Sequence, residues 1–308
     1  MRVEKVESSE FRRILDEVRL DPYFLFVSAH IKFHLEGIME EDLELDLWRI
    51  RDGDRLAYAV VKHNSHKSLV FLESNCYDPE FCMQIAKLFA DALYDTVKNG
   101  DYVFGFGILE PLVDLFERNI LDLGIRRSHP FKILEDRVNL YHLCEDGRKL
   151  VEEKEPELPE GYRFERLKPQ HAAEILADQL YGKITSPKPY ERTLSLLPSV
   201  GVFTEDTNEL VSYEFLDVTG AITSQFTRHP HRRKGIGSAV EWKICAETWK
   251  KVGLIPLKAV SHNRPRVLKL SDNSPLWTQK LDESGTPINA KFFMYCKTDM
   301  PKIEFYEN

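Results

Sequence analysis

The residue types and spacing that most clearly predict chemistry lie in one basic stretch, residues 229–240, with the sequence HPHRRKGIGSAV. Within it, Arg232, Gly235 and Gly237 follow the order Arg-x-x-Gly-x-Gly. Glycine has no Cβ atom to keep a ligand away from backbone N–H groups, and a helix that begins here adds the positive end of its dipole. The stretch therefore predicts a turn that binds a pyrophosphate group.

A turn before a helix often contains glycine for backbone reasons alone, and a charged loop is often merely solvated, so both interpretations stay open. The local charge argues against them, because an anionic ligand explains a cluster of cations in an acidic chain better than either alternative. Four cations fall within seven residues of a chain whose formal net charge is −8: Arg228, Arg232, Arg233 and Lys234.

The motif resembles that of the acetyl-coenzyme A-dependent N-acetyltransferase (GNAT) superfamily, Arg/Gln-x-x-Gly-x-Gly/Ala between a strand and a helix. Two further segments resemble its glycine N-acyltransferase branch. Residues 213–220 (YEFLDVTG) end in a Thr-Gly turn before the strand, and Ser261-His262 is followed by Asn263 at the start of a helix. The resemblance covers about residues 160–297.

The resemblance implies that coenzyme A (CoA) lies where the strand before the motif and the parallel strand after the helix separate. The first strand would pair with the pantetheine, and the backbone N–H groups of residues 233–238 would meet the pyrophosphate. The three cations of the motif would add charge-assisted hydrogen bonds. The implied CoA-binding residues are Phe226, Thr227, Arg232, Arg233, Lys234, Gly235, Ile236, Gly237, Ser238 and Asn263.

Acyl transfer to an amine needs a base for the amine proton and an acid for the leaving thiolate. The branch has a glutamate immediately after its Thr-Gly turn, and Ala221 stands at that place here. The remaining catalytic candidates are His262, whose type titrates near neutral pH, and Glu214, acting through water. A capping or packing histidine and a solvated carboxylate are the open alternatives. The superfamily's frequent acid, a tyrosine on the following helix, has no counterpart at residues 263–274, where Ser271 is a poor replacement.

A chain of 308 residues predicts two domains. Residues 152–161 (EEKEPELPEG) are charged, contain two prolines and lack an apolar period, so they predict a linker between domains at 1–151 and 162–308. In the second domain we expect strands at 162–167, 200–204, 210–217, 221–227, 257–260 and 292–296, and helices at 171–180, 190–197, 236–252 and 267–270.

The N-terminal half has the element order of the same superfamily, which predicts a second, degenerate copy. Its counterpart of the motif, residues 74–79 (SNCYDP), lacks paired glycines and cations, so we expect no nucleotide there and a structural or substrate-shaping role. Gly105 and Gly107 lie within a strand and indicate close packing. The expected elements are helices at 8–18, 23–35, 79–98 and 111–120, and strands at 46–50, 56–61, 69–73 and 103–107.

The expected fold class is therefore α/β (α+β), with two GNAT-type domains, each a mixed, mostly antiparallel twisted sheet flanked by helices. The negative net charge argues against nucleic acid as a partner, and the absence of a run of ~18 apolar residues argues against a membrane span. Five scattered cysteines, an odd number, predict a reducing compartment, the cytoplasm or alternatively the mitochondrial matrix. None has metal-ligand spacing with histidine, so no metal site is expected.

These observations predict an acyl-CoA-dependent N-acyltransferase that uses acetyl-CoA or another acyl-CoA as cosubstrate. The expected partner is a small-molecule amine, such as glycine or another amino acid, and the expected state is a monomer or homodimer. One alternative is an N-acetyltransferase for protein or polyamine amines. The other is a non-catalytic acyl-CoA-binding module that lost its base with Ala221.

Overall fold

The structure is a computed structural model of the 308-residue chain. It describes residues 1–38, 42–65, 67–97, 102–109, 112, 114–116, 118–119, 132–179, 186–282 and 284–296. The chain divides into two compact units. Unit 1 comprises Met1–Tyr141, Ala259–Asp272 and Gln279–Asn308, and unit 2 comprises His142–Lys258 and Asn273–Thr278.

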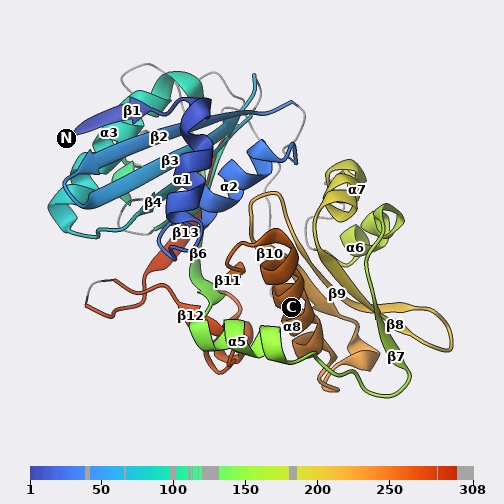
Figure 1. The fold of residues 1–308 in the computed structure, drawn as a ribbon. Helices are drawn as coiled ribbons and strands as arrows, with labels where there is room; N and C mark the ends of the chain where they lie inside the picture. Colours follow the sequence, from blue (N-terminus) through green and yellow to red (C-terminus); the bar gives the residue numbers. More distant parts are fainter. Residues whose placement is uncertain are drawn as a thin grey trace. The chain divides into compact units, whose positions relative to one another are not determined.

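The strands of unit 1 lie in a sheet of nine described strands, ordered β1-β2-β3-β4-β5-β13-β6-β11, with β12 paired to β6 (Figure 1). Most neighbours are antiparallel, whereas β4 and β5 are parallel. The division between the units falls within β6, β11 and β12. The bounds are β1 Arg2–Lys5, β2 Glu44–Asp52, β3 Arg55–His63, β4 Lys67–Ser74, β5 Tyr102–Leu109, β6 Lys132–Leu143, β11 Leu257–Ser261, β12 Trp277–Gln279 and β13 Asn289–Cys296.

Helices cover both faces of this sheet, with α1 and α2 on one face and α3 on the other (Figure 1). The apolar residues of α1 recur at helical spacing and are all buried: Phe11, Ile14, Leu15 and Val18. Of the helix expected at 111–120, the described residues 112, 114–116 and 118–119 are helical, and the other four positions lie outside the described residues. The bounds are η1 Ser8–Glu10, α1 Phe11–Val18, α2 Leu25–Leu35, α3 Pro79–Val97 and α9 Pro265–Asp272.

The last described strand, β13, pairs with both β5 and β6 in the sheet of unit 1. The sequence analysis assigned these residues to the second domain, because a short apolar run carries no signal of its partner strands. Close packing at Gly105 is confirmed, since a Cβ atom there would lie 2.1 Å from the ring of Phe293. The linker at residues 152–161, as a boundary between independent domains, stays a prediction.

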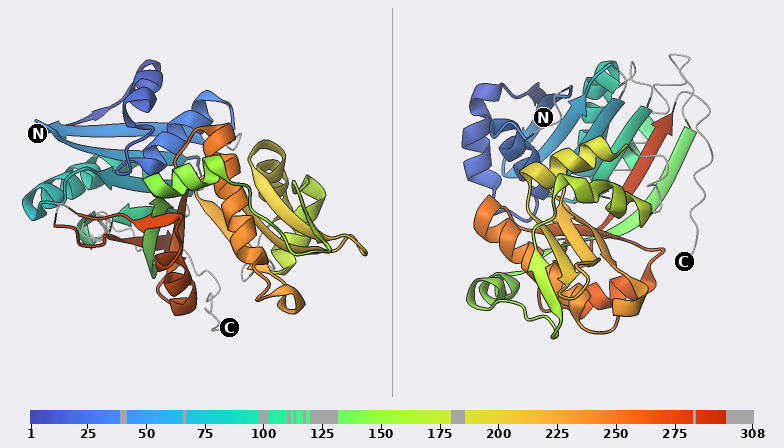
Figure 2. Two further views of the ribbon diagram at one scale, coloured as in Figure 1. Left: turned by 60° about the horizontal axis from the view of Figure 1, so that its bottom comes forward. Right: turned by 90° about the vertical axis from the view of Figure 1, so that its right-hand side faces the viewer.

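Unit 2 contains a four-stranded antiparallel sheet with the order β10-β9-β8-β7. Helix α8 lies on one of its faces, and α6 and α7 lie on the other (Figure 2). Because both faces are covered, every residue of β8 and β9 is buried. The bounds are α5 Glu145–Glu153, β7 Tyr162–Glu165, η2 Pro169–His171, α6 Ala172–Ala177, α7 Pro187–Leu196, β8 Ser199–Thr204, β9 Leu210–Leu216, β10 Ile222–Thr227, η4 His229–His231, α8 Ile236–Glu247 and η5 Thr248–Val252.

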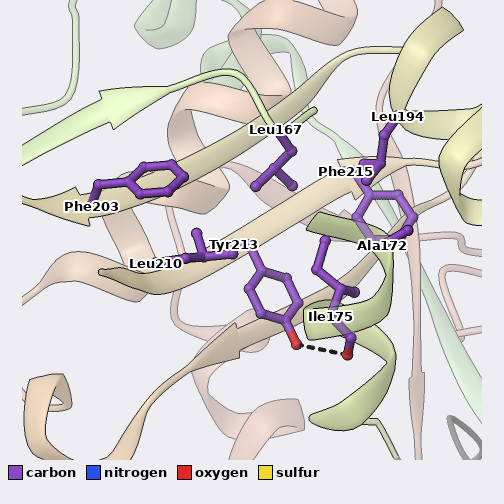
Figure 3. Packing of buried hydrophobic residues seen from close by; sticks show 8 residues of the cluster. All are labelled: Leu167, Ala172, Ile175, Leu194, Phe203, Leu210, Tyr213 and Phe215. Atoms are coloured by element: carbon purple, nitrogen blue, oxygen red, sulfur yellow. Dashed lines mark hydrogen bonds between the residues drawn. The ribbon is translucent and has the colours of Figure 1, made fainter. Parts of the chain in front are cut away.

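One face of the unit 2 sheet packs against α6 and α7 through a buried apolar cluster, and alternate side chains of β9 enter this cluster. Tyr213 and Phe215 pack in a buried apolar cluster, and the Tyr213 hydroxyl donates a hydrogen bond to the Ile175 carbonyl at 3.3 Å (Figure 3). Side chains alternate along a strand, so Ser212 and Glu214 point to the opposite face, which carries α8.

Some elements carry too weak a sequence pattern to be expected. Neither β1 nor the twelve-residue β6 was predicted, and α5 includes the first two residues of the expected linker. Only Gly147 and Val151 of α5 are buried, so the helix has almost no apolar face to detect. Within the described ranges, no helix has the length and apolar character needed to cross a membrane.

Candidate functional site

The strand that leads into the glycine motif is bent by a β-bulge. Its register with β9 breaks between Thr223 and Phe226, and Ser224 has a φ of 63°. A bulge leaves backbone groups outside the strand ladder and re-aims the chain. The side-chain amide of Gln225 donates to the Gly237 carbonyl at 3.2 Å, which ties the bulge to the first turn of α8.

Residues 232–238, the glycine loop, form the N-terminus of α8. Gly235 is the N-cap residue with a φ of 81°, and within the described part of the chain no side-chain capping hydrogen bond is made at this N-cap. Gly237 lies so close to Thr227 that a Cβ atom would stand 3.3 Å from its Oγ1. Since the first N–H groups of a helix have no partner within the helix, the loop offers them to an anion.

The cations of the glycine loop are exposed, and two are held in place. Arg232 Nε donates to the Thr227 carbonyl at 2.7 Å, and Lys234 Nζ lies 2.9 Å from the Tyr162 hydroxyl. Arg233 is exposed as well, with a φ of 62°. Arg228 differs, because its guanidinium pairs with acidic side chains of unit 2. These partners are Glu174 at 2.6 Å, Glu209 at 3.0 Å and Asp178 at 3.7 Å.

Glu214 is 2% exposed, so the interpretation as a solvated carboxylate is wrong. Burial raises the pKa of its carboxyl group well above 4.5, and the charge of Glu241 raises it further, whereas Lys258 and Gln225 oppose the shift. Lys258 Nζ lies 2.5 Å from Glu241 Oε1. Within the described part of the chain, Glu214 Oε2 has no hydrogen-bond partner. This environment favours the neutral acid, which suits donating a proton better than accepting one.

His262 and Asn263 belong to unit 1, whereas Glu214 and the glycine loop belong to unit 2. His262 is exposed; its backbone N–H donates to the Arg137 carbonyl at 2.9 Å, and its Nε2 lies 2.6 Å from Asn139 Oδ1. The Asn263 backbone N–H donates to Ser261 Oγ at 3.1 Å. Each is thus fixed at the end of β11, ahead of α9.

Two of the positions at which the sequence departs from the resemblance, Ala221 and Ser271, are buried, whereas a third, Pro230, which stands one position later than the proline of the family, is exposed. Ala221 is 3% exposed and forms an isolated parallel bridge with Leu257, which confirms the expected parallel direction of the two strands at this pair. Ser271 is 2% exposed, and its Oγ has no partner among the described residues.

Sequence reasoning missed several residues around the glycine loop. Tyr162 contacts Lys234, and its hydroxyl lies 2.9 Å from His231 Nδ1, although the tyrosine stands far upstream in the chain. Lys258 was missed too, although a charged residue inside the apolar run LKAV is a signal of a buried partner.

Comparisons with known proteins identify the fold. No protein-family model matches the chain, and no curated protein matches its sequence. A Drosophila protein of known crystal structure matches with a TM-score of 0.69 at 14% identity, covering 96% of this chain and 98% of that one. A tandem GNAT protein from the clavulanic acid biosynthesis pathway matches with a TM-score of 0.51 at 12% identity, covering 97% and 99%. The chain has the tandem GNAT fold.

A GCN5-related N-acetyltransferase from Sphaerobacter thermophilus gives a TM-score of 0.47 at 13% identity, covering 96% of this chain and 94% of that one. Its score lies below that of the tandem GNAT protein, whose likeness to this chain gives the fold. The tandem GNAT fold confirms the fold class expected from the sequence, with mixed, mostly antiparallel sheets flanked by helices.

Proposed function

We propose that this tandem GNAT protein is an acyl-CoA-dependent N-acyltransferase of the glycine N-acyltransferase type, with glycine or another amino acid as the amine acceptor. One observation carries the proposal: shortly after a bulged strand, α8 begins at a glycine N-cap that has no side-chain capping hydrogen bond among the described residues. A helix N-terminus that begins at glycine and is flanked by exposed cations suits a pyrophosphate.

The residues of unit 2 suit CoA in both charge and shape. The backbone N–H groups of residues 233–238 would hold the pyrophosphate, with the exposed side chains of Arg232, Arg233 and Lys234 around it. The glycine at 237 keeps the turn close to Thr227. Phe226 and Thr227, at the end of β10, would pair with the pantetheine. Acyl-CoA supplies the thioester, whose carbonyl carbon is the electrophile.

The proposed acyl transfer moves two protons, one from the amine and one to the leaving thiolate, and side chains of this protein must accept and donate them. A C–N bond forms at the thioester carbonyl as the C–S bond breaks, the amine loses one proton, and CoA leaves as the thiol. We assign the base role to His262, whose side chain is exposed. Glu214 is the candidate donor through water, because its burial favours the protonated form. Asn263 stays a candidate contact to CoA.

A non-catalytic acyl-CoA-binding module is the second candidate. Ala221 favours it, since this residue stands where the resemblance implies a glutamate and is buried in a strand bridge. Both candidates predict that CoA stabilises the protein by about 2.7 kcal/mol at ~100 times its Kd. Only the enzyme releases thiol in response to an amine.

The deciding experiment measures free thiol released from acetyl-, benzoyl- and longer acyl-CoA donors while glycine, other amino acids, polyamines and lysine peptides are varied. The proposal predicts a rate that saturates in both donor and amino acid. A preference for polyamines or peptides would overturn the acceptor assignment. Stabilisation by CoA without amine-dependent thiol release would overturn the enzyme in favour of the binding module.

A further inference from the structure

A chain of hydrogen bonds in unit 1 leads from the end of α9 to the side chain of His262. The Tyr141 hydroxyl donates to Asp272 Oδ1 at 2.6 Å. Asn139 Nδ2 lies 3.4 Å from the same hydroxyl, and Asn139 Oδ1 lies 2.6 Å from His262 Nε2. Asn139 and Tyr141 stand two residues apart on β6, so their side chains share one face of the sheet.

Asp272 determines which group donates and which accepts in each of these hydrogen bonds. A carboxylate only accepts hydrogen bonds, and a tyrosine hydroxyl has a single proton, which here goes to Asp272. The Tyr141 oxygen must then accept from its other neighbours. Gln279 does donate to it, at 3.3 Å, and also donates to Asp272 at 2.8 Å.

The same logic fixes the amide of Asn139. Its NH₂ group must face the Tyr141 oxygen, which accepts, so its carbonyl oxygen faces His262. An amide oxygen cannot donate, so the hydrogen bond to the ring requires a proton on His262 Nε2. Nδ1 of the neutral ring is then the nitrogen that can accept a proton.

We propose that Asn139 and Tyr141 are positioning residues that hold neutral His262 as its Nε2–H tautomer and leave Nδ1 to take the proton of the acceptor amine. The inference rests on the proposed function, in which His262 is the base. Removing this orientation lowers the rate without removing any group that touches the substrate.

The residues around Tyr141 and His262 support these donor and acceptor roles. Tyr141 is 1% exposed, and burial together with its bond to Asp272 raises the pKa of the hydroxyl to about 12, so it keeps its proton where histidine titrates. Charged residues that lie close in sequence to Asn139 or to His262 include Asp136, Arg137 and Arg264. Asp136 accepts from Ser261 Oγ at 3.0 Å, and the Arg137 carbonyl holds the backbone of His262. The ring itself meets the neutral amide.

The test is long-range ¹H–¹⁵N NMR of the full chain labelled at histidine, with the His262 signals assigned from a His262→Gln sample. We expect the neutral wild-type ring to show the Nε2–H pattern. Tyr141→Phe removes the accepting oxygen, so the amide can turn and the tautomers mix. Asn139→Asp places a carboxylate beside Nε2, and the midpoint of the His262 titration moves to higher pH. Tyr190→Phe, which removes a hydroxyl bonded to Gln179 in unit 2, is the matched control and leaves these signals unchanged.

Kinetics separates orientation from structure. Tyr141→Phe should lower kcat by about tenfold at an unchanged KM, which is less than the ~10²–10⁴-fold that a positioned base contributes because His262 itself remains, and should move the acid limb of the pH profile. An Nδ1–H ring in the wild type, or unchanged His262 signals in both Tyr141→Phe and Asn139→Asp, would overturn the inference. The expected tautomer combined with full activity of His262→Ala would uphold the network and overturn His262 as the base. The NMR result needs no substrate, so it stands apart from any failure of the proposed function.

Discussion

In each unit a short segment joins a strand to a long helix, β4 to α3 in unit 1 and β10 to α8 in unit 2. The residue before the helix is acidic in unit 1 and a glycine in unit 2. In unit 1, Asp78 stands before α3, and its Oδ1 accepts from the Phe81 backbone N–H at 2.9 Å. Within that turn, the Ser74 hydroxyl also donates to the Cys76 carbonyl at 2.9 Å and accepts from the Cys76 backbone N–H at 3.1 Å. In unit 2, Gly235 stands before α8, and no side-chain capping hydrogen bond is found there among the residues that the structure describes. A self-capped helix end has satisfied the donors that a ligand would need.

Each unit also buries a glutamate on a strand, with different partners. Glu73 in β4 is 1% exposed; its Oε1 lies 3.5 Å from Lys280 Nζ, and its Oε2 accepts from the Val27 backbone N–H at 2.9 Å. Glu214 in β9 has one carboxyl oxygen with no partner among the described residues. The first carboxyl is paired with an ammonium group and a backbone N–H, whereas the second is buried beside the carboxylate of Glu241, and only Lys258 and Gln225 oppose the rise of its pKa. The comparison predicts opposite responses to the same substitution.

The largest effect is expected for Glu73→Gln. The change leaves the Lys280 ammonium, which is 3% exposed, without its opposite charge, so unfolding free energy should fall by about 3 kcal/mol, as for other broken buried pairs. Urea denaturation measures it. Glu73→Leu combined with Lys280→Met should recover most of the loss, and a double variant no more stable than Glu73→Gln would contradict the pairing.

Gly235→Val should weaken CoA binding by about 10²-fold, because the side chain obstructs the approach of phosphate to the backbone and removes hydrogen bonds to a charged group. Gly253→Val is a matched control for backbone strain, since Gly253 also has a positive φ of 72° and, among the described residues, no atom within 4 Å of a Cβ position. Both variants should lose similar stability, and calorimetry should show an affinity loss only in the first. Equal affinity in the two would make the loop a purely structural turn.

Asp78→Ala should cost about 1 kcal/mol of unfolding free energy, the usual loss for an N-cap residue. Exposing the end of α3 should nevertheless create no CoA site, because residues 74–79 lack cations and paired glycines. The check is the stoichiometry in calorimetry, which we expect to stay at one CoA per chain. Uptake of a second CoA would show that the cap alone separates the two turns.

The smallest effect is expected for Glu214→Gln, which should raise the melting temperature at pH 8 and not at pH 4. Burial and the charge of Glu241 raise the pKa of Glu214, so the folded state binds its proton more tightly than the unfolded chain does. Its contribution to stability is present below the ordinary carboxyl pKa, about 4.3, and is lost as pH rises through the raised value. Glutamine stays neutral throughout. A variant less stable than the wild type at pH 8 would mean that Glu214 is held as a charged partner of Lys258.

The features that the sequence predicts are local ones. The glycine loop could be found because the order of Arg232, Gly235 and Gly237 and the flanking apolar runs lie within one short segment. The burial of Glu214 could not, because it depends on α8 and on Lys258, which pack from distant parts of the chain. The pairing of β13 between β5 and β6 is equally non-local. The orientation of His262 by Asn139 requires a contact across 123 positions of sequence, which no spacing rule reports.

The central claim is that the N-terminus of α8 binds the pyrophosphate of CoA. Ser238 is exposed and is the third residue of this helix. A glutamate there should leave the helix as stable or more stable, by about 0.3–1 kcal/mol, because it interacts favourably with the dipole, yet it should repel a bound phosphate. Calorimetric titration of CoA into the wild type, Ser238→Glu and the neutral control Ser238→Gln is the direct test. The account predicts that Ser238→Glu, folded and undiminished in melting temperature, loses affinity about tenfold or more while Ser238→Gln stays near the wild type. Wild-type affinity in Ser238→Glu would contradict it.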